Sequence, residues 1–220
     1  MGALSKYKTF IFDWDGTLRS VSAARKLNSI VNPNWRRKKS AAHSGLDRST
    51  PNDITANAKH VHTSTTLAKL RGAESEFFVF WADVSLKFMV PKLSYGAKPL
   101  LENLERRRAS VALYTEGALW RVRRELDYLR VTDYFEAILS AQDVGRLKPD
   151  PLGLEVLLEA LGAKKAGAIY VGDMKDDMLA AKNAGIASCA VTNGFDSADM
   201  LKGVKPDYIF SSLEELAKEL

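Results

Sequence analysis

The 220-residue sequence contains a single cysteine, no long apolar run and only a small excess of positive charge. Because one cysteine, Cys189, cannot form a disulfide within the chain, we expect a reducing, cytoplasmic setting in which it packs as a small buried side chain. No apolar run approaches the roughly 18 residues of a membrane span, and the first residues lack the pattern of a signal peptide. These absences argue against a membrane partner and favour an ordinary globular protein.

The net charge of +5 is distributed unevenly along the chain. Residues 19–96 contain 13 Lys/Arg and 5 Asp/Glu, whereas the remainder contains 19 and 22. A basic segment that faces a binding site would attract an anionic ligand. The alternative is a solvated surface with a nonspecific attraction to nucleic acid. The basic residues lack the interleaved aromatic side chains of a stacking surface, which argues against nucleic acid as a partner.

The pattern of apolar residues predicts an α/β fold. A first strand ends at Phe12, and further strands are expected at 110–114, 137–140, 166–171, 188–191 and 207–210. Helices are expected at 99–108, 118–129, 150–161, 177–184 and 213–220. Strands that alternate with helices indicate a doubly wound, Rossmann-like parallel sheet with helices on both faces. Residues 1–18 and 97–220 would form this core domain.

Residues 19–96 differ in character and are expected to form an inserted, mostly helical cap domain. Helices are expected at 21–31, 51–70 and 74–89, with a polar loop between the first two. The apolar residues of the third helix are typical of core packing.

Acidic, hydroxyl and basic residues follow four of the predicted strands. Asp13 and Asp15 follow the first, and the other three are followed by Thr115, by Lys148, and by Asp173 with Asp177. Each has a plainer explanation: an Asp-x-Asp-Gly turn, a helix cap, an exposed loop lysine and acids at a helix N-terminus. Because ligands bind at the carboxyl ends of strands in such sheets, the ordered set of four favours a functional site.

The four segments resemble the signature motifs of the haloacid dehalogenase-like superfamily of phosphohydrolases. The matching segments are Asp13-Trp14-Asp15-Gly16-Thr17-Leu18, Ala112-Leu113-Tyr114-Thr115, Lys148-Pro149, and Gly172-Asp173 with Asp177. The tail of the fourth, residues 177–185, is similar to the phosphoglycolate-phosphatase-like branch. That branch carries its helical cap between the first two motifs, where residues 19–96 lie.

The resemblance implies a Mg²⁺-dependent phosphatase that hydrolyses a small phosphomonoester, with phosphoglycolate as the first candidate. Asp13 would attack phosphorus and form an aspartyl-phosphate, and Asp15 would protonate the leaving oxygen and later activate water. Mg²⁺ would be held by Asp13, Asp15 (through its backbone carbonyl), Asp173 and Asp177. The phosphorylated metabolite would be bound by Thr115, Glu116, Gly117 and Lys148, and Thr115 and Lys148 would also take part in catalysis.

Two other functions remain open from the sequence. One is a sugar-phosphate mutase of the same superfamily, which shares the same acids. The other is a non-catalytic protein that binds a partner through the basic insertion. For any of these, we expect a monomer or a homodimer.

Three residues depart from the family pattern. Trp14 is bulkier than the usual aliphatic residue between the two acids, although we expect its side chain to point away from the metal. Glu116 places a negative charge beside the expected phosphate site, and we expect it to face the cap or a substrate amine or hydroxyl. Arg19 follows the first motif, where acidic or serine residues are usual, and we expect it on the linker rather than on an anionic substrate.

Overall fold

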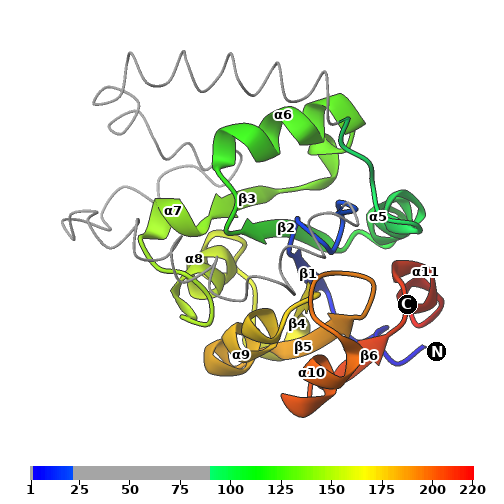
Figure 1. Cartoon of the computed structure of the whole chain (residues 1–220), viewed down its shortest axis with the longest axis vertical. Helices are drawn as coiled ribbons and strands as arrows, with labels where there is room; N and C mark the ends of the chain where they lie inside the picture. The colour runs from blue at the N-terminus through cyan, green and yellow to red at the C-terminus, as the bar shows by residue number, and fades with distance from the viewer. Residues whose placement is uncertain (1, 22–89) are drawn as a thin grey trace.

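The computed structural model describes residues 2–21 and 90–220, in which six strands form one parallel sheet (Figure 1). The order across the sheet is β3-β2-β1-β4-β5-β6. The strands are β1 (Thr9–Phe12), β2 (Ser110–Thr115), β3 (Ala137–Ser140), β4 (Ala168–Gly172), β5 (Ala187–Val191) and β6 (Tyr208–Phe210). The prediction of a doubly wound parallel sheet is confirmed. The helices expected at 21–31, 51–70 and 74–89 lie outside the described residues.

The first strand of the chain lies near the middle of the sheet. Thr9 pairs with Ser110 of β2 on one side and with Ala168 of β4 on the other. All four residues of β1 are buried. The chain builds outward from β1 to β3 and then crosses to the other side of β1 to begin β4. Ligands bind at such a reversal of strand order, and here it lies between β1 and β4.

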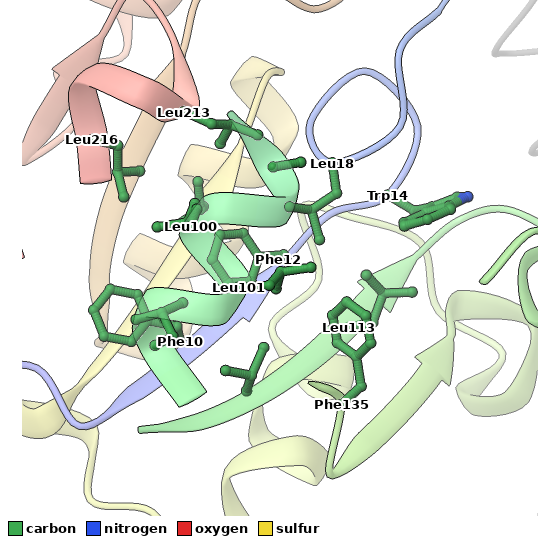
Figure 2. Close-up of a cluster of buried hydrophobic side chains, with 14 of the residues drawn as sticks. Phe10, Phe12, Trp14, Leu18, Leu100, Leu101, Leu113, Phe135, Leu213 and Leu216 are labelled. Carbon is green, nitrogen blue, oxygen red and sulfur yellow. The ribbon is translucent and has the colours of Figure 1, made fainter. Parts of the chain in front are cut away.

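Helices cover both faces of the sheet because successive strand residues point to opposite sides. Phe10 and Phe12 enter one apolar cluster, whereas Ile11 enters a second. Figure 2 shows the first cluster, where Phe10 and Phe12 lie among leucines from two helices. The helices over this first face are α5 (Ala97–Arg106), α6 (Leu119–Leu129) and α11 (Leu213–Lys218). The second face is covered by α8 (Leu152–Ala160) and α9 (Lys175–Ala184).

The predicted strands and long helices of the core are present, with ends shifted by a few residues. Two short helices, α7 (Ala141–Val144) and α10 (Ala198–Gly203), were not predicted, and neither were two 3₁₀ turns, η1 (Thr132–Tyr134) and η2 (Lys165–Gly167). Elements this short are not long enough to show a periodic pattern of apolar residues. The start of α7 is instead fixed by side-chain caps. The Ser140 hydroxyl accepts from the Gln142 N–H at 3.2 Å, and the Asp143 carboxylate accepts from the Ser140 N–H at 3.0 Å.

Cys189 is fully buried in the first cluster, as expected. Across residues 2–21 and 90–220, no helix combines the length and the apolar character needed to cross a bilayer.

Helix α8 packs on the sheet through a glycine that leaves room for an aromatic ring. A Cβ at Gly153 would overlap the ring of Tyr114, which is fully buried in β2. We therefore expect Gly153→Ala to lower the free energy of unfolding by about 1–3 kcal/mol, because the ring has no free space to enter. Thermal denaturation measures this loss.

Gly203→Ala is the matched control, since Gly203 also lies in a helix and a Cβ there meets no neighbour within 4 Å. Its effect should stay within about 0.5 kcal/mol. Equal losses in the two variants would contradict the close packing of α8 on Tyr114.

Candidate active site

Three carboxylates meet at the reversal point of the sheet. Asp13 directly follows β1, Asp173 directly follows β4, and Asp177 lies in the first turn of α9. One oxygen from each lies within 4.8 Å of the others, and all three residues are buried. The fold therefore brings acids from two strand ends together.

Lys148 provides the positive charge inside this group. Its Nζ donates to Asp13 Oδ1 at 2.6 Å and to Asp177 Oδ1 at 2.7 Å. Its side chain is only 4% exposed, so the lysine is not the exposed loop residue of the plainer explanation. The ammonium joins the end of β1 to the start of α9.

Two tyrosines, from the strands on either side of β1, lie against Lys148. The ammonium lies 5.4 Å from the ring centre of Tyr114 and 5.5 Å from that of Tyr170, distances at which an aromatic face attracts a cation. The Tyr170 hydroxyl lies 3.2 Å from both Asp177 Oδ1 and the Tyr114 carbonyl, and it can donate to one of them at a time. The rings therefore exclude water from one side of the ammonium.

Asp177 serves the helix and the lysine at once. Its Oδ2 accepts from the Met174 N–H at 3.0 Å and from the Asp173 N–H at 3.2 Å, which caps the N-terminus of α9. Its Oδ1 accepts from Lys148. The position of Asp177 predicts a helix cap, and the resemblance to the family predicts a role in the site. One carboxylate can serve both.

Asp173 is held by two donors and by the close approach of two glycines. Thr17 Oγ1 donates to its Oδ1 at 2.7 Å, and the Phe195 N–H donates to its Oδ2 at 2.7 Å. A Cβ at Gly16 or at Gly194 would overlap the Asp173 carboxylate. Gly16 also has φ 102°, a conformation that strongly favours glycine. The Asp-x-Asp-Gly turn therefore makes room for an acid from another strand.

The site contains more negative charge than its one ammonium balances. Burial raises the pKa of Asp13 well above its usual value, and Asp177 and Asp173 add to this although Lys148 opposes it. Burial and the charge of Asp177 raise the pKa of Asp173 to about 7, against the hydrogen bonds from Phe195 and Thr17. Burial lowers the pKa of Lys148, but Asp13 and Asp177 outweigh it, so its pKa is raised and the lysine stays charged.

This excess fits a divalent cation. With all three acids ionised, Asp13, Asp173 and Asp177 carry three negative charges against one on Lys148. Carboxylate oxygens are the donors that Mg²⁺ prefers. The side chain of Asp15 does not belong to this group, and the participation of its backbone carbonyl stays a prediction.

The loop after β2 supplies the other predicted residues. The Gly117 N–H donates to Thr115 Oγ1 at 3.0 Å, which fixes the hydroxyl at the end of the strand. Glu116 Oε1 accepts from the Lys148 N–H at 3.1 Å. Its carboxylate therefore ties the β2 loop to the Lys148 loop, a contact within the protein that sequence reasoning did not foresee.

The carboxylate of Asp15 contacts two arginines. Arg19 Nη1 donates to Asp15 Oδ1 at 2.8 Å, and Arg121 contacts both carboxylate oxygens. Arg19 is 7% exposed, and its burial against Asp15 was not expected from the sequence. Burial lowers the pKa of Arg121, but Asp15 and Glu125 raise it by more, and the guanidinium stays charged.

A buried glutamate completes this second cluster. Glu125 Oε2 accepts from Trp14 Nε1 at 2.7 Å and from Arg121 Nη1 at 2.8 Å. The Trp14 ring lies in the first apolar cluster (Figure 2). Sequence reasoning missed Glu125 and Arg121. Their only signal is a spacing of four residues on a predicted helix, which is typical of surface ion pairs.

Comparison with known proteins identifies relatives of the chain. A family profile described as haloacid dehalogenase-like hydrolase matches residues 10–191. Phosphoglycolate phosphatase from Vibrio parahaemolyticus is 34% identical over 119 residues, 54% of this chain and 52% of that protein. Pyrophosphatase PpaX from Halalkalibacterium halodurans is 31% identical over 121 residues, 55% and 56% of the two chains. The chain thus spans about half the length of these two relatives.

Another relative is covered over a longer stretch. Phosphoglycolate phosphatase from Neisseria meningitidis is 31% identical over 171 residues, 74% of this chain and 73% of that protein. Among solved structures, CbbY from Rhodobacter sphaeroides in complex with phosphate has a TM-score of 0.65 at 19% identity, with 96% of each chain covered. A haloacid dehalogenase-like family hydrolase from Streptococcus pneumoniae has a TM-score of 0.61 at 21% identity, with 97% and 98% covered. These two structural likenesses establish the fold.

Because the pKa values of Asp13 and Asp173 are raised in the folded protein, its free energy of unfolding should depend on pH. The folded protein binds these two protons more tightly than the unfolded chain, in which Asp titrates near 3.9. The extra stability is fully present below about pH 4 and is lost as the pH rises through the folded values, about 7 for Asp173. In EDTA, we expect the melting temperature to fall by roughly 5 °C between about pH 5 and about pH 8.

Asp173→Asn should remove a large part of this fall, because the amide does not titrate. Added Mg²⁺ should restore stability most at the higher pH, where it does not compete with protons. A melting temperature that rises over this range, or an unchanged slope in Asp173→Asn, would contradict the electrostatics of the site.

Proposed function

The chain belongs to the haloacid dehalogenase-like hydrolases, and on that basis we propose that it is a Mg²⁺-dependent phosphatase of small phosphomonoesters. The observation that carries the proposal is the buried ammonium of Lys148, shared between Asp13 at 2.6 Å and Asp177 at 2.7 Å. A nucleophilic carboxylate and a phosphate group repel each other, and a cation fixed against the carboxylate reduces that repulsion.

In the first step, an Asp13 oxygen attacks phosphorus. The new P–O bond forms as the bond to the leaving oxygen breaks, and Asp15 gives a proton to that oxygen. Lys148 lies on the nucleophile from the start and offsets charge on the transferring group. Thr115, fixed at the end of β2, donates its hydroxyl to a phosphoryl oxygen.

In the second step, water attacks the phosphorus of the aspartyl-phosphate. Asp15, now ionised, takes a proton from the water, and the P–O bond to Asp13 breaks with its electrons returning to the carboxylate. The products are inorganic phosphate and the original Asp13. Asp177 holds Lys148 throughout both steps.

Mg²⁺ would be held by Asp13 and Asp173, with Asp177 beside them and the backbone carbonyl of Asp15 as a further ligand. When bound, it supplies positive charge that stabilises the negative phosphoryl oxygens. Two glycines keep Asp173 close to the end of β1, since a Cβ at Gly16 or at Gly194 would displace its carboxylate.

Phosphoglycolate is the first candidate substrate, because two relatives above carry the name phosphoglycolate phosphatase. Pyrophosphate belongs beside it in any panel, because another relative is named pyrophosphatase. The sugar-phosphate mutase shares the same acids, and the insertion that would distinguish it lies outside the described residues. The cytoplasmic setting and the monomeric or homodimeric state stay predictions.

The proposal is tested by hydrolysis of p-nitrophenyl phosphate and of a panel of phosphomonoesters with pyrophosphate, in Mg²⁺ and in EDTA. We expect Asp13→Asn to lower kcat at least about 1,000-fold, because an amide cannot form the aspartyl-phosphate. EDTA should abolish turnover of the unchanged protein.

Asp199→Asn provides the matched control, since Asp199 is an exposed acid on α10, and its activity should be unchanged. Metal-independent turnover, or full activity in Asp13→Asn, would refute the mechanism. Transfer of phosphate between sugar positions without release of inorganic phosphate would favour the mutase.

A further inference from the structure

We propose that Arg121 is a positioning residue, which holds the carboxylate of Asp15 in the orientation needed to pass a proton to the leaving oxygen. This inference rests on the proposed phosphatase function. It concerns the second polar cluster, formed by Trp14, Asp15, Arg19, Arg121 and Glu125.

The contact between Arg121 and Asp15 is a two-point contact. Arg121 Nη1 donates to Asp15 Oδ1 at 3.2 Å, and Arg121 Nη2 donates to Asp15 Oδ2. Two roughly parallel bonds between a planar guanidinium and a carboxylate restrict rotation of the carboxylate, which a single bond does not. Arg121 therefore defines the direction in which Asp15 presents its oxygens.

The guanidinium is itself anchored. Arg121 lies in the first turn of α6, and its Nη1 also donates to Glu125 Oε2 at 2.8 Å, one turn further along. Trp14 Nε1 donates to the same oxygen at 2.7 Å. Because Trp14 precedes Asp15 in the chain, the contacts form a closed ring through Glu125 and Arg121 back to Asp15. The ring fixes the acid relative to the nucleophile Asp13.

Arg19 holds Asp15 less firmly than Arg121 does. Its Nη1 donates to Asp15 Oδ1 at 2.8 Å, but its Nε, although 3.1 Å from Glu125 Oε2, is buried and lacks a hydrogen-bond partner among the described residues. A carboxylate oxygen has two lone pairs, and Trp14 and Arg121 occupy those of Oε2. Arg121 is thus the arginine with the complete anchor.

The pair lies beside the predicted phosphate loop. A Cβ at Gly117 would lie 3.2 Å from Thr115 Oγ1 and 3.3 Å from Asp15 Oδ2, and it would overlap Arg121 Nη2. The guanidinium therefore reaches the loop only because residue 117 is glycine. Asp15 Oδ2 and the Thr115 hydroxyl, which is expected to bind phosphate, thus both lie close to Gly117.

The network also has a cost that a purely structural role does not require. Glu125 is 3% exposed and Arg19 is 7% exposed, and apolar side chains of similar volume stabilise a core at least as well as buried ion pairs do. Two arginines contact two carboxyl groups, and one of those groups belongs to the proposed acid. The structure thus places costly buried ion pairs where orientation affects the reaction.

The test compares two esters that differ in their need for a proton. Nitrophenolate leaves readily without one, whereas an alkoxide leaves slowly unless it is protonated. We would measure kcat and KM of Arg121→Gln and Arg121→Lys with p-nitrophenyl phosphate and with glycerol phosphate. In both variants, kcat for glycerol phosphate should fall about 30-fold and kcat for p-nitrophenyl phosphate less than about 3-fold, with KM nearly unchanged.

Arg121→Lys separates charge from geometry, since lysine restores the charge balance but cannot make the two-point contact. Its melting temperature should fall less than that of Arg121→Gln, while the selective loss persists. Arg106→Gln, an exposed arginine at the end of α5, is the control and should alter neither ester.

Equal losses for the two esters, no loss, or full recovery in Arg121→Lys would each overturn the positioning role and leave the phosphatase function standing. Failure of the unchanged protein to hydrolyse either ester would instead remove the proposed function, and this inference with it.

Discussion

The structure depends on one buried ammonium. Lys148 contacts Asp13 at the end of β1 and Asp177 at the start of α9, and both carboxylates are shielded from water. Removing one partner from such a group leaves an uncompensated buried charge, which costs about 3–5 kcal/mol. The same contacts that hold a strand, a loop and a helix together thus place the cation on the proposed nucleophile. Stability and chemistry cannot be varied independently at this point.

The fold could be predicted because its signals are local. Apolar runs such as Thr9–Phe12 and Ala168–Gly172 indicate buried strands. Polar residues just past the ends of these strands indicate the edge of the sheet where a site would lie. The grouping of Asp13, Asp173, Asp177 and Lys148 was expected because they follow predicted strands and because their segments resemble the family motifs. Their chemical roles, and the bound ion, remain predictions that the experiments above address.

The second cluster could not be predicted, because its partners are far apart in sequence and carry no periodic signal. Trp14 and Glu125 are separated by 111 residues, yet one hydrogen bond joins them. Trp14 and Arg19 looked like unrelated departures from a family pattern. The structure shows that the two residues lie around the same buried carboxylate. The contact of Glu116 could not be predicted either. Its partner is the backbone N–H of Lys148, and a pattern of side chains does not indicate such a contact.

The central place of β1 also governs how the molecule forms during synthesis. Phe12 pairs with Leu113 on one side and with Val171 on the other, so β1 leaves the ribosome well before the two strands that flank it. Until then its apolar side chains and both of its hydrogen-bonding edges lack their native partners, a state that invites association between chains. The proposed nucleophile at the end of this strand is therefore synthesised well before the residues that surround it in the folded protein.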